Sequence, residues 1–379
     1  MSANKPKVAL VLFTNLGVGA GTEIIAKALA SEFVKENLAS YVSIVQTDYM
    51  DSHISGERFS PGMHEGIDIE ELRSPLNSGF IISLLNKNGK TKFFGEFIKN
   101  FLYFILNFGK INKILSRVDK IIFLSYSEAW TWFLLKRRHK MYIISGECDL
   151  PTLPILKRIM MSNADKIHYL TSSQMNKFDY PSNSYFIVPN GINSKLFIPE
   201  FNVKHENESK TRVLYVGRLE EGKGILEILE AAEYLKTDEW LEITIVGIGS
   251  LDHKIKKDRY KNIKFVGYVP NDRVSYYYSN TDIFLFPTHG EPYGTVVLEA
   301  ISSGAYALVS SNLNGYFDDL KALGALEYID NNASNIAKEL VRLKGFRLSS
   351  SKKDEIHQYI EQNYSWNNIA KTWMKCIID

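Results

Sequence analysis

Short apolar runs alternate along the chain with longer segments whose apolar residues recur at helical spacing. The first run, Val8–Phe13, is continuously apolar, as expected of a strand buried on both faces. A glycine-rich turn follows it, and then a helix is predicted from about Thr22 to Glu36, where apolar residues lie on one helical face. This alternation predicts the α/β class, with parallel sheets covered by helices.

The strand pattern occurs in two series, which predicts two domains. The first series adds strands at 42–45, 121–124, 142–144, 167–170 and 185–188. The second places strands at 213–216, 243–246, 263–266, 283–286 and 307–309, with helices at 224–235 and 293–303. The polar stretch 202–210 is typical of a loop, and the tail from about residue 352 is helical with a break near 364–366. We therefore expect two Rossmann-like domains, 1–190 and 191–360, facing a ligand cleft, and a terminal helix, 361–379, that packs back on the first domain.

The composition is that of a globular protein and excludes several other classes of protein. The 379 residues are 45% hydrophobic and 23% charged, with a formal net charge of +2. These values are those of a globular protein and do not indicate a nucleic-acid binder. Two cysteines are too few for a disulfide scaffold, and no long apolar stretch or signal-peptide pattern appears. We expect a cytoplasmic protein.

The strongest chemical signal is Glu291-Pro-Tyr-Gly-Thr-Val-Val-Leu-Glu299, which follows an apolar strand and a turn. Gly294 permits close backbone approach, and a helix is predicted to begin near Thr295. Free amides and the positive dipole end at a helix start favour a diphosphate. Glu299 would lie about one turn into this helix, where it can accept hydrogen bonds from a ribose. Glu291 would face a sugar, although two solvated glutamates on a surface loop would fit the same pattern.

A second element, Gly217-Arg-Leu-Glu-Glu-Gly-Lys-Gly224, comes directly after a predicted strand. Arg218 and Lys223 would sit at the carboxyl end of that strand and the start of the next helix. Two cations there can neutralise a pyrophosphate and stabilise it as a leaving group. The Walker pattern is absent, and an ordinary turn with exposed basic residues remains the alternative.

Together these elements resemble glycosyltransferase family 4, retaining enzymes of the GT-B fold. Further ordered segments support the resemblance: Val188-Pro-Asn-Gly-Ile-Asn193 with Phe197 and Pro199, Val246-Gly-Ile-Gly249, Phe265-Val-Gly-Tyr268, and Ala300 with Gly304 and the strand Ala307–Ser311. The similarity is dense from about residue 189 to 315 and thin before it.

The resemblance implies a role for each candidate residue. Arg218 and Lys223 would bind the donor phosphates, Glu299 the ribose, and Glu291 the transferred sugar, so that Glu291, Arg218 and Lys223 form the catalytic set. Gly249 and Tyr268 would lie on the nucleotide side, and the backbone around Tyr293, Gly294 and Thr295 would complete the phosphate and sugar site. The resemblance also implies that no metal or other cofactor is needed, and the acids Asp318 and Asp319 are expected to start a helix instead.

The amino-terminal half carries a weaker signal in Gly17-Val-Gly-Ala-Gly-Thr-Glu23. It resembles the family's glycine-rich loop, in which Gly17 and Gly19 would approach the donor. A rival interpretation is a dinucleotide fingerprint with Asp48 as the ribose ligand. Thr22 occupies the place of the third fingerprint glycine, and the rival leaves the motifs of the second half unexplained.

One departure from the family pattern concerns the sugar site. Many members carry a histidine after the strand that corresponds to 142–145, whereas this chain reads Ser145-Gly-Glu-Cys-Asp149. Glu147 and Cys148 occupy the corresponding place as candidate sugar-site residues. We therefore assign no catalytic histidine, and a buried structural thiol at Cys148 remains open.

Residues 87–120 contain eight Lys or Arg and only two acids, interleaved with seven aromatic residues. Such a segment can contact an anionic membrane surface and bring a lipid-linked acceptor to the enzyme. The alternative is a core-facing helix with a solvated basic edge. Polynucleotide binding is not expected, because no recognition module accompanies the charge.

The sequence thus predicts transfer of a hexose from a UDP- or GDP-sugar to a hydroxyl of a glycan or lipid-linked acceptor, as in surface polysaccharide synthesis. Two alternatives remain: a non-catalytic partner that binds nucleotide sugars, and another GT-B sugar enzyme such as an epimerase.

Overall fold

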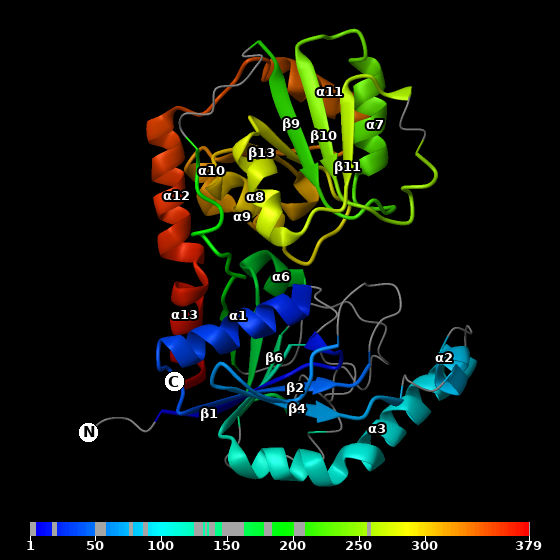
Figure 1. Cartoon of the computed structure of the whole chain (residues 1–379), viewed down its shortest axis with the longest axis vertical. Helices are drawn as coiled ribbons and strands as arrows, with labels where there is room; N and C mark the ends of the chain where they lie inside the picture. The colour runs from blue at the N-terminus through cyan, green and yellow to red at the C-terminus, as the bar shows by residue number, and fades with distance from the viewer. Residues whose placement is uncertain are drawn as a thin grey trace. The chain divides into compact units, whose positions relative to one another are not determined.

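Strands of the first half pair into one eight-stranded sheet in the order β3-β4-β2-β1-β5-β6-β7-β8 (Figure 1). All neighbouring strands are parallel except β3 and β4, which pair antiparallel. The computed structural model describes residues 5–16, 21–49, 58–75, 79–85, 90–124, 132, 135, 141–145, 163–177, 184–200, 209–255 and 259–378. The strands are β1 (Lys7–Val11), β2 (Tyr41–Thr47), β3 (Gly62–His64), β4 (Ile67–Leu72), β5 (Lys120–Phe123), β6 (Met141–Ser145), β7 (Lys166–Tyr169) and β8 (Tyr185–Ile187).

Helices cover both faces of this sheet. Successive side chains of β1 point to opposite faces, so they pack against different helices. Val8 and Leu10 pack with α1 (Gly21–Lys35) and α13 (Trp366–Ile378), whereas Ala9 and Val11 pack with α3 (Lys90–Arg117). The described residues of this half also include two short helices, α2 (Gly79–Leu85) and α6 (Ser172–Lys177). The sequence therefore predicted the continuous apolar run at 8–13 correctly, and its helix at 22–36 differs from α1 by one residue at each end.

The second half forms a six-stranded parallel sheet in the order β11-β10-β9-β12-β13-β14. Its strands are β9 (Thr211–Val216), β10 (Leu241–Val246), β11 (Ile263–Gly267), β12 (Ile283–Phe286), β13 (Tyr306–Ser310) and β14 (Leu326–Ile329). Its helices are α7 (Ile225–Tyr234), α8 (Asn271–Ser279), α9 (Thr295–Ser302), the 3-10 turn η4 (Ser311–Leu313), α10 (Asp318–Ala322), α11 (Ala333–Arg342) and α12 (Ser350–Tyr364). In this doubly wound order the direction of winding reverses between β9 and β12, the place where such sheets bind ligands.

The chain divides into two compact units, one formed by Met1–Pro189 with Trp366–Asp379 and the other by Asn190–Ser365. We call them unit 1 and unit 2. The sequence had placed the boundaries at 190 and 360. Helix α12 belongs to unit 2, since it packs on α9 within that unit, and the tail begins to contribute to unit 1 only after Ser365.

Three strands were absent from the sequence prediction. Strand β3 is largely exposed, β4 is buried at only three of its six positions, and β14 is buried only at its two ends. The predicted break near 364–366 is confirmed between α12 and α13. The predicted acidic helix start is confirmed as well, because α10 begins with Asp318 and Asp319.

Candidate functional site

The loop after β9 presents Arg218 to solvent. The Tyr215 hydroxyl donates a hydrogen bond to the Arg218 carbonyl oxygen at 3.0 Å, which anchors the backbone. The guanidinium is 69% exposed, and its Nη1 lies 3.0 Å from Oε1 of Glu220. Arg218 therefore stands on a fixed loop with a largely exposed cationic head.

Lys223 lies at the end of the same loop and is much less exposed. Its Nζ is 2.6 Å from Oε2 of Glu291 and 3.2 Å from the carbonyl oxygen of Gly290. Glu291 comes from the loop after β12, the strand that neighbours β9. The structure thus joins two sequence-predicted site residues at the point where the winding of the sheet reverses.

Close backbone packing holds these two loops together. The amide of His289 donates to the carbonyl oxygen of Gly222 at 2.9 Å, and the Thr288 hydroxyl donates to the same oxygen at 3.2 Å. Gly224 has φ +78°, and a Cβ there would lie 2.2 Å from the carbonyl oxygen of Pro287. Only glycine fits this contact, so Gly224 is what lets Lys223 reach Glu291.

Helix α9 begins directly after the second loop. Gly294 is the N-cap residue, with φ +90°, and as a glycine it offers no side-chain cap to the first turn. A Cβ on Gly294 would lie 3.1 Å from the Phe286 ring. The first backbone N–H groups of a helix lack intrahelical partners, so an uncapped start favours an anion. Thr295, at the first helical position, is partly exposed, and its role in the donor site stays a prediction.

Glu299 lies one turn into α9 and is partly exposed. The buried Tyr278 hydroxyl, from α8, donates to its Oε2 at 3.0 Å. Desolvation of the carboxyl raises the pKa of Glu299 to about 7, and the hydrogen bond from Tyr278 opposes this only in part. The position is therefore a carboxylate at alkaline pH and a carboxylic acid at acidic pH.

The Tyr293 side chain belongs to the packing of unit 2. It is 2% exposed, and its ring centroid lies 5.3 Å from that of Phe317. Within the described residues its hydroxyl has no hydrogen-bond partner, and burial raises the pKa of Tyr293. The expected contribution of Tyr293 to the donor site through its backbone stays a prediction.

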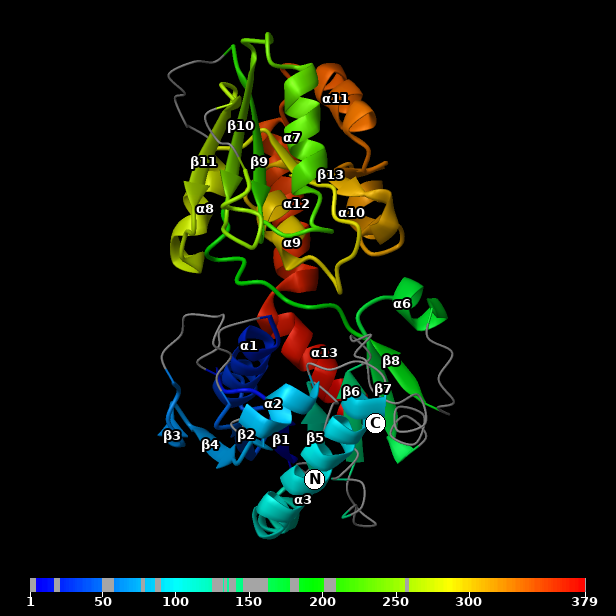
Figure 2. The same cartoon turned by 90° about the vertical axis from the view of Figure 1, so that its right-hand side faces the viewer.

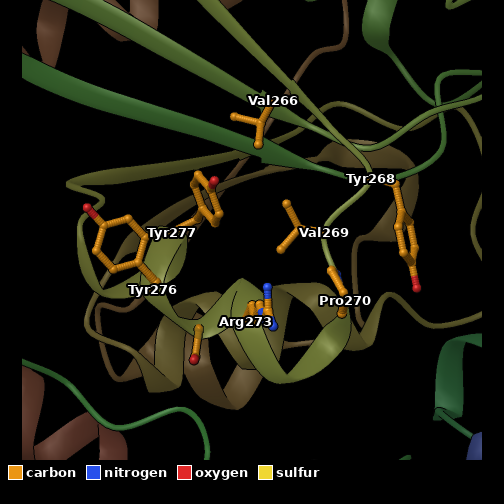
Figure 3. Close-up of a pocket in the computed structure, with 8 residues that line it drawn as sticks. Val266, Tyr268, Val269, Pro270, Arg273, Tyr276 and Tyr277 are labelled. Carbon is orange, nitrogen blue, oxygen red and sulfur yellow. The ribbon is translucent and has the colours of Figure 1, made fainter.

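Gly249 follows β10, and Tyr268 follows β11. In the sheet these two strands lie on the side of β9 that is away from β12. A Cβ on Gly249 would lie 2.4 Å from the carbonyl oxygen of Leu219, so this glycine lets the turn after β10 pack against the Arg218 loop. Tyr268 is 68% exposed and lines a pocket of about 580 Å³ between β11 and α8. Figure 3 shows Tyr268 on one side of this pocket and Tyr276 and Tyr277 on the other, with Val269 between them.

Sequence reasoning missed several residues of this region. Arg273, Tyr276 and Tyr277 line the pocket. In the sequence, the run of three tyrosines at 276–278 was the feature that could have indicated this surface. His289 was also missed; its Nε2 lies 2.6 Å from Oε1 of Glu227, which joins the loop after β12 to α7.

Other predicted residues are untested. Gly17, Gly19, Glu147 and Cys148 lie outside the described residues. Across the described part of the chain, no three His, Cys, Asp or Glu side chains gather as a metal site requires. The expectation that the chemistry needs no metal or other cofactor stays a prediction.

Comparison with known proteins gives a family pattern for unit 2. Residues 198–344 match the model of "Glycosyl transferases group 1". An uncharacterized glycosyltransferase of Methanocaldococcus jannaschii is 28% identical over 51% of this chain and 54% of its own length. The amylovoran biosynthesis glycosyltransferase AmsK of Erwinia amylovora is 30% identical over 34% of this chain and 38% of its own length. The chain thus spans about half or less of these curated relatives.

Solved structures extend the likeness over the whole chain. Sucrose-phosphate synthase from Thermosynechococcus elongatus has a TM-score of 0.73 at 16% identity and covers 98% of both chains. Anabaena HepE in complex with UDP and glucose has a TM-score of 0.67 at 11% identity and covers 99% of this chain and 100% of its own. The two-unit α/β architecture is therefore the GT-B fold of solved glycosyltransferases, and residues 198–344 carry the sequence pattern of the group 1 glycosyl transferases.

Proposed function

We propose that the protein is a retaining glycosyltransferase that moves a hexose from a UDP- or GDP-sugar to a hydroxyl acceptor. One observation carries the proposal: Lys223 and Glu291, from the loops after β9 and β12, meet at 2.6 Å where the sheet reverses its winding. Arg218 and the uncapped start of α9 belong to the same two loops. This combination suits a sugar joined to a diphosphate.

The Lys223 ammonium can serve the phosphate and the sugar together. It has three N–H donors, of which two are directed at Glu291 and at the Gly290 carbonyl oxygen. The third remains for a phosphate oxygen. With Arg218 it would stabilise the charge that develops on the leaving diphosphate, while Glu291 faces the transferred sugar.

The reaction would break the bond between the anomeric carbon and the diphosphate oxygen, and form one from that carbon to the acceptor oxygen. In this proposal the diphosphate departs on the face that the acceptor enters. Its oxygen then takes the proton of the incoming hydroxyl, so configuration is retained without a separate protein base. Metal-independent chemistry is part of the proposal, since Arg218 and Lys223 would supply the positive charge.

For the nucleotide, we place the ribose at Glu299 and the base near Gly249 and Tyr268. The solved HepE complex, which holds UDP and glucose, supports a uridine donor. AmsK, named for amylovoran biosynthesis, supports a role in polysaccharide synthesis with a glycan or lipid-linked acceptor. Among the described residues, no helix combines the length and apolarity needed to cross a bilayer. We propose a cytoplasmic location and a peripheral membrane contact through residues 87–120.

A donor screen tests this proposal. UDP- and GDP-sugars are added to the protein, and the midpoint of thermal unfolding is measured. A ligand at 100 times its Kd stabilises the folded state by about 2.7 kcal/mol, so the right donor should raise the midpoint visibly. Products are then analysed for transfer or hydrolysis. Binding without turnover would favour a non-catalytic nucleotide-sugar partner, and a changed sugar on an intact nucleotide would favour an epimerase. No shift with any nucleotide sugar would reject the proposal.

A further inference from the structure

A fully buried tyrosine holds one side of the Glu299 carboxylate. Tyr278 is 0% exposed, and its hydroxyl donates to Oε2 of Glu299 at 3.0 Å. It lies in the last turn of α8, which packs beside α9 (Figure 2). The ring packs edge-on against Phe197 and Phe284, with centroid distances of 5.7 and 5.8 Å. Because the ring is held on two sides, the position of the hydroxyl is fixed as well, and with it one oxygen of the carboxylate.

The Tyr278 hydroxyl acts as a donor to the ionised form of Glu299. Burial first, and then the charge of Glu299, raise the pKa of Tyr278 well above its ordinary value, so the phenol stays protonated. An ionised carboxylate offers acceptors only, and a hydrogen bond to it stabilises the charged form. Desolvation raises the pKa of Glu299 to about 7, and the hydrogen bond from Tyr278 lowers it. Tyr278 therefore influences both the orientation and the charge of the carboxylate.

The second oxygen of this carboxylate is left for a ligand. Glu299 is partly exposed, and among the described residues its Oε1 has no hydrogen-bond partner. It lies one turn after the start of α9, where the first backbone N–H groups favour a phosphate. A nucleotide that binds there by its diphosphate can place its ribose at Oε1, because the ribose is joined directly to the diphosphate.

Within the described residues, the neighbouring elements bring no other group that shifts the pKa of Glu299. Helix α9 packs mainly on α8, α12, β12 and β13, and β12 is apolar throughout. On α12, Nδ1 of His357 lies 3.0 Å from Oγ of Ser302, at the other end of α9. The other titratable side chains of these elements include Arg273, Tyr276 and Tyr277 on α8, Tyr306 on β13 and Lys353 on α12. Desolvation and Tyr278 therefore account for the pKa of Glu299 in this part of the chain.

We propose that Tyr278 is a positioning residue of the nucleotide site, which holds Oε2 of Glu299 so that Oε1 accepts hydrogen bonds from the ribose diol. The proposal rests on the function proposed above, because it needs a nucleotide with its ribose at Glu299. It makes the site prefer ribose to a sugar that lacks both hydroxyls, and it makes this preference grow as Glu299 ionises. A tyrosine that only packed against its neighbours would affect neither property.

Calorimetry tests this proposal with UDP and 2′,3′-dideoxy-UDP, and with GDP and 2′,3′-dideoxy-GDP, between pH 6 and pH 9. The ratio of the two Kd values for one base reports recognition of the diol, and ionisation of the diphosphate cancels in it. For the base that the wild type binds more tightly, the ratio should rise through about pH 7. It should reach at least about tenfold at pH 9, because hydrogen bonds to a charged group are strong and the dideoxy sugar leaves the carboxylate unpaired.

Tyr278→Phe removes the hydroxyl and keeps the ring that packs in the core. Without this donor the charged form of Glu299 is less favoured, so the midpoint of the rise should move up by about one pH unit. At pH 7 the ratio should fall about threefold, which is the loss that such a shift in ionisation produces. Glu299→Gln should keep the ratio low at every pH, and the thermal midpoint of each variant reports that it is folded.

The matched control is Tyr234→Phe, which removes another phenol of unit 2 that donates to a glutamate, at 2.6 Å from Oε1 of Glu230. It should give the wild-type ratio at every pH. If Tyr278→Phe weakens both nucleotides of a pair equally and leaves the pH profile of the ratio unchanged, the proposal is overturned while the assignment of Glu299 stands. A ratio that Glu299→Gln leaves unchanged would remove the ribose from Glu299 and the role of Tyr278 with it. A wild type that binds neither UDP nor GDP would reject the proposed function itself.

Discussion

At the scale of single residues, the candidate site combines one exposed cation with a half-buried ion pair. Arg218 is 69% exposed, whereas the Lys223 side chain is 19% and that of Glu291 24% exposed. The exposed cation is available to an incoming phosphate, and the ion pair fixes the geometry of the two loops. Glu299 differs from both, because it accepts a hydrogen bond from a neutral phenol, that of Tyr278.

The raised pKa of Glu299 makes its effect on stability depend on pH. Its pKa is about 7 in the fold, against an ordinary value of 4.5, so the folded state binds the proton more tightly. Stability from this group is therefore present below pH 4.5 and is lost as the pH rises to 7. Between pH 5 and pH 8 the wild type should therefore lose free energy of unfolding as Glu299 gives up its proton. Glu299→Gln should avoid this loss, which is on the order of 3 kcal/mol.

The same substitution should weaken donor binding, because a ribose diol donates its hydrogen bonds to a carboxylate more strongly. Urea titrations at both pH values, with calorimetric UDP binding at pH 8, measure the two effects. Parallel pH profiles of stability for the variant and the wild type would contradict the desolvation of Glu299.

At the scale of elements, the site depends on the loop after β9, which contains two glycines in the left-handed region. Gly222 and Gly224 both have positive φ, at +83° and +78°. A Cβ on Gly222 meets nothing within 4 Å, whereas one on Gly224 would collide with the backbone of Pro287. Substitutions at these two glycines therefore distinguish two free-energy costs. One is the cost of the left-handed backbone conformation, and the other is the cost of the steric contact with Pro287.

Gly222→Ala should lower the free energy of unfolding by about 1 kcal/mol, the cost of the backbone conformation alone. Gly224→Ala should cost about 2 kcal/mol more, because the loops after β9 and β12 must move apart. It should also weaken UDP binding, whereas Gly222→Ala should affect UDP binding less. Chemical denaturation and calorimetry measure both, and equal losses of stability would show that the contact with Pro287 is unimportant.

The sequence could predict those elements whose pattern is local. Strands β9, β10 and β12 are apolar runs, and α9 follows a glycine and begins with helix-compatible residues, so each was found. Strand β14 was missed because Glu327 and Tyr328 interrupt its burial. The Lys223–Glu291 contact joins residues 68 positions apart, and no local pattern reveals such a distance. Arg273 and Tyr276 were missed because exposed residues on a short helix carry no periodic signal.

At the scale of the whole molecule, the last helix, α13, packs on one face of the sheet of unit 1. Helix α13 contributes Trp373 to the core of unit 1, where its ring centroid lies 4.4 Å from that of His168 and 5.1 Å from that of Phe186. Burial lowers the pKa of His168 to about 4, against a hydrogen bond to the Val188 carbonyl oxygen that raises it. The core of unit 1 thus combines residues from the first half of the chain with residues of α13.

Trp373→Ala should destabilise unit 1 by about 3–5 kcal/mol, the usual cost of emptying a buried aromatic site. Ile378→Ala, on the same helix but 53% exposed, should change the stability of unit 1 by less than about 0.5 kcal/mol. Calorimetric scans of both variants measure the difference. A Trp373→Ala protein with the wild-type transitions would show that α13 is dispensable for unit 1.

The central claim is that unit 2 holds a sugar donor by its diphosphate, and Arg218 tests it most directly. Turnover is measured at saturating donor for Arg218→Ala and for Arg259→Ala, whose guanidinium is also exposed and also paired with a single glutamate in unit 2. Losing one stabiliser of the leaving group costs about 2.7–4 kcal/mol, so Arg218→Ala should lower kcat about 10²- to 10³-fold. Arg259→Ala should keep the wild-type rate. Near-normal turnover by Arg218→Ala at saturating donor would contradict the account.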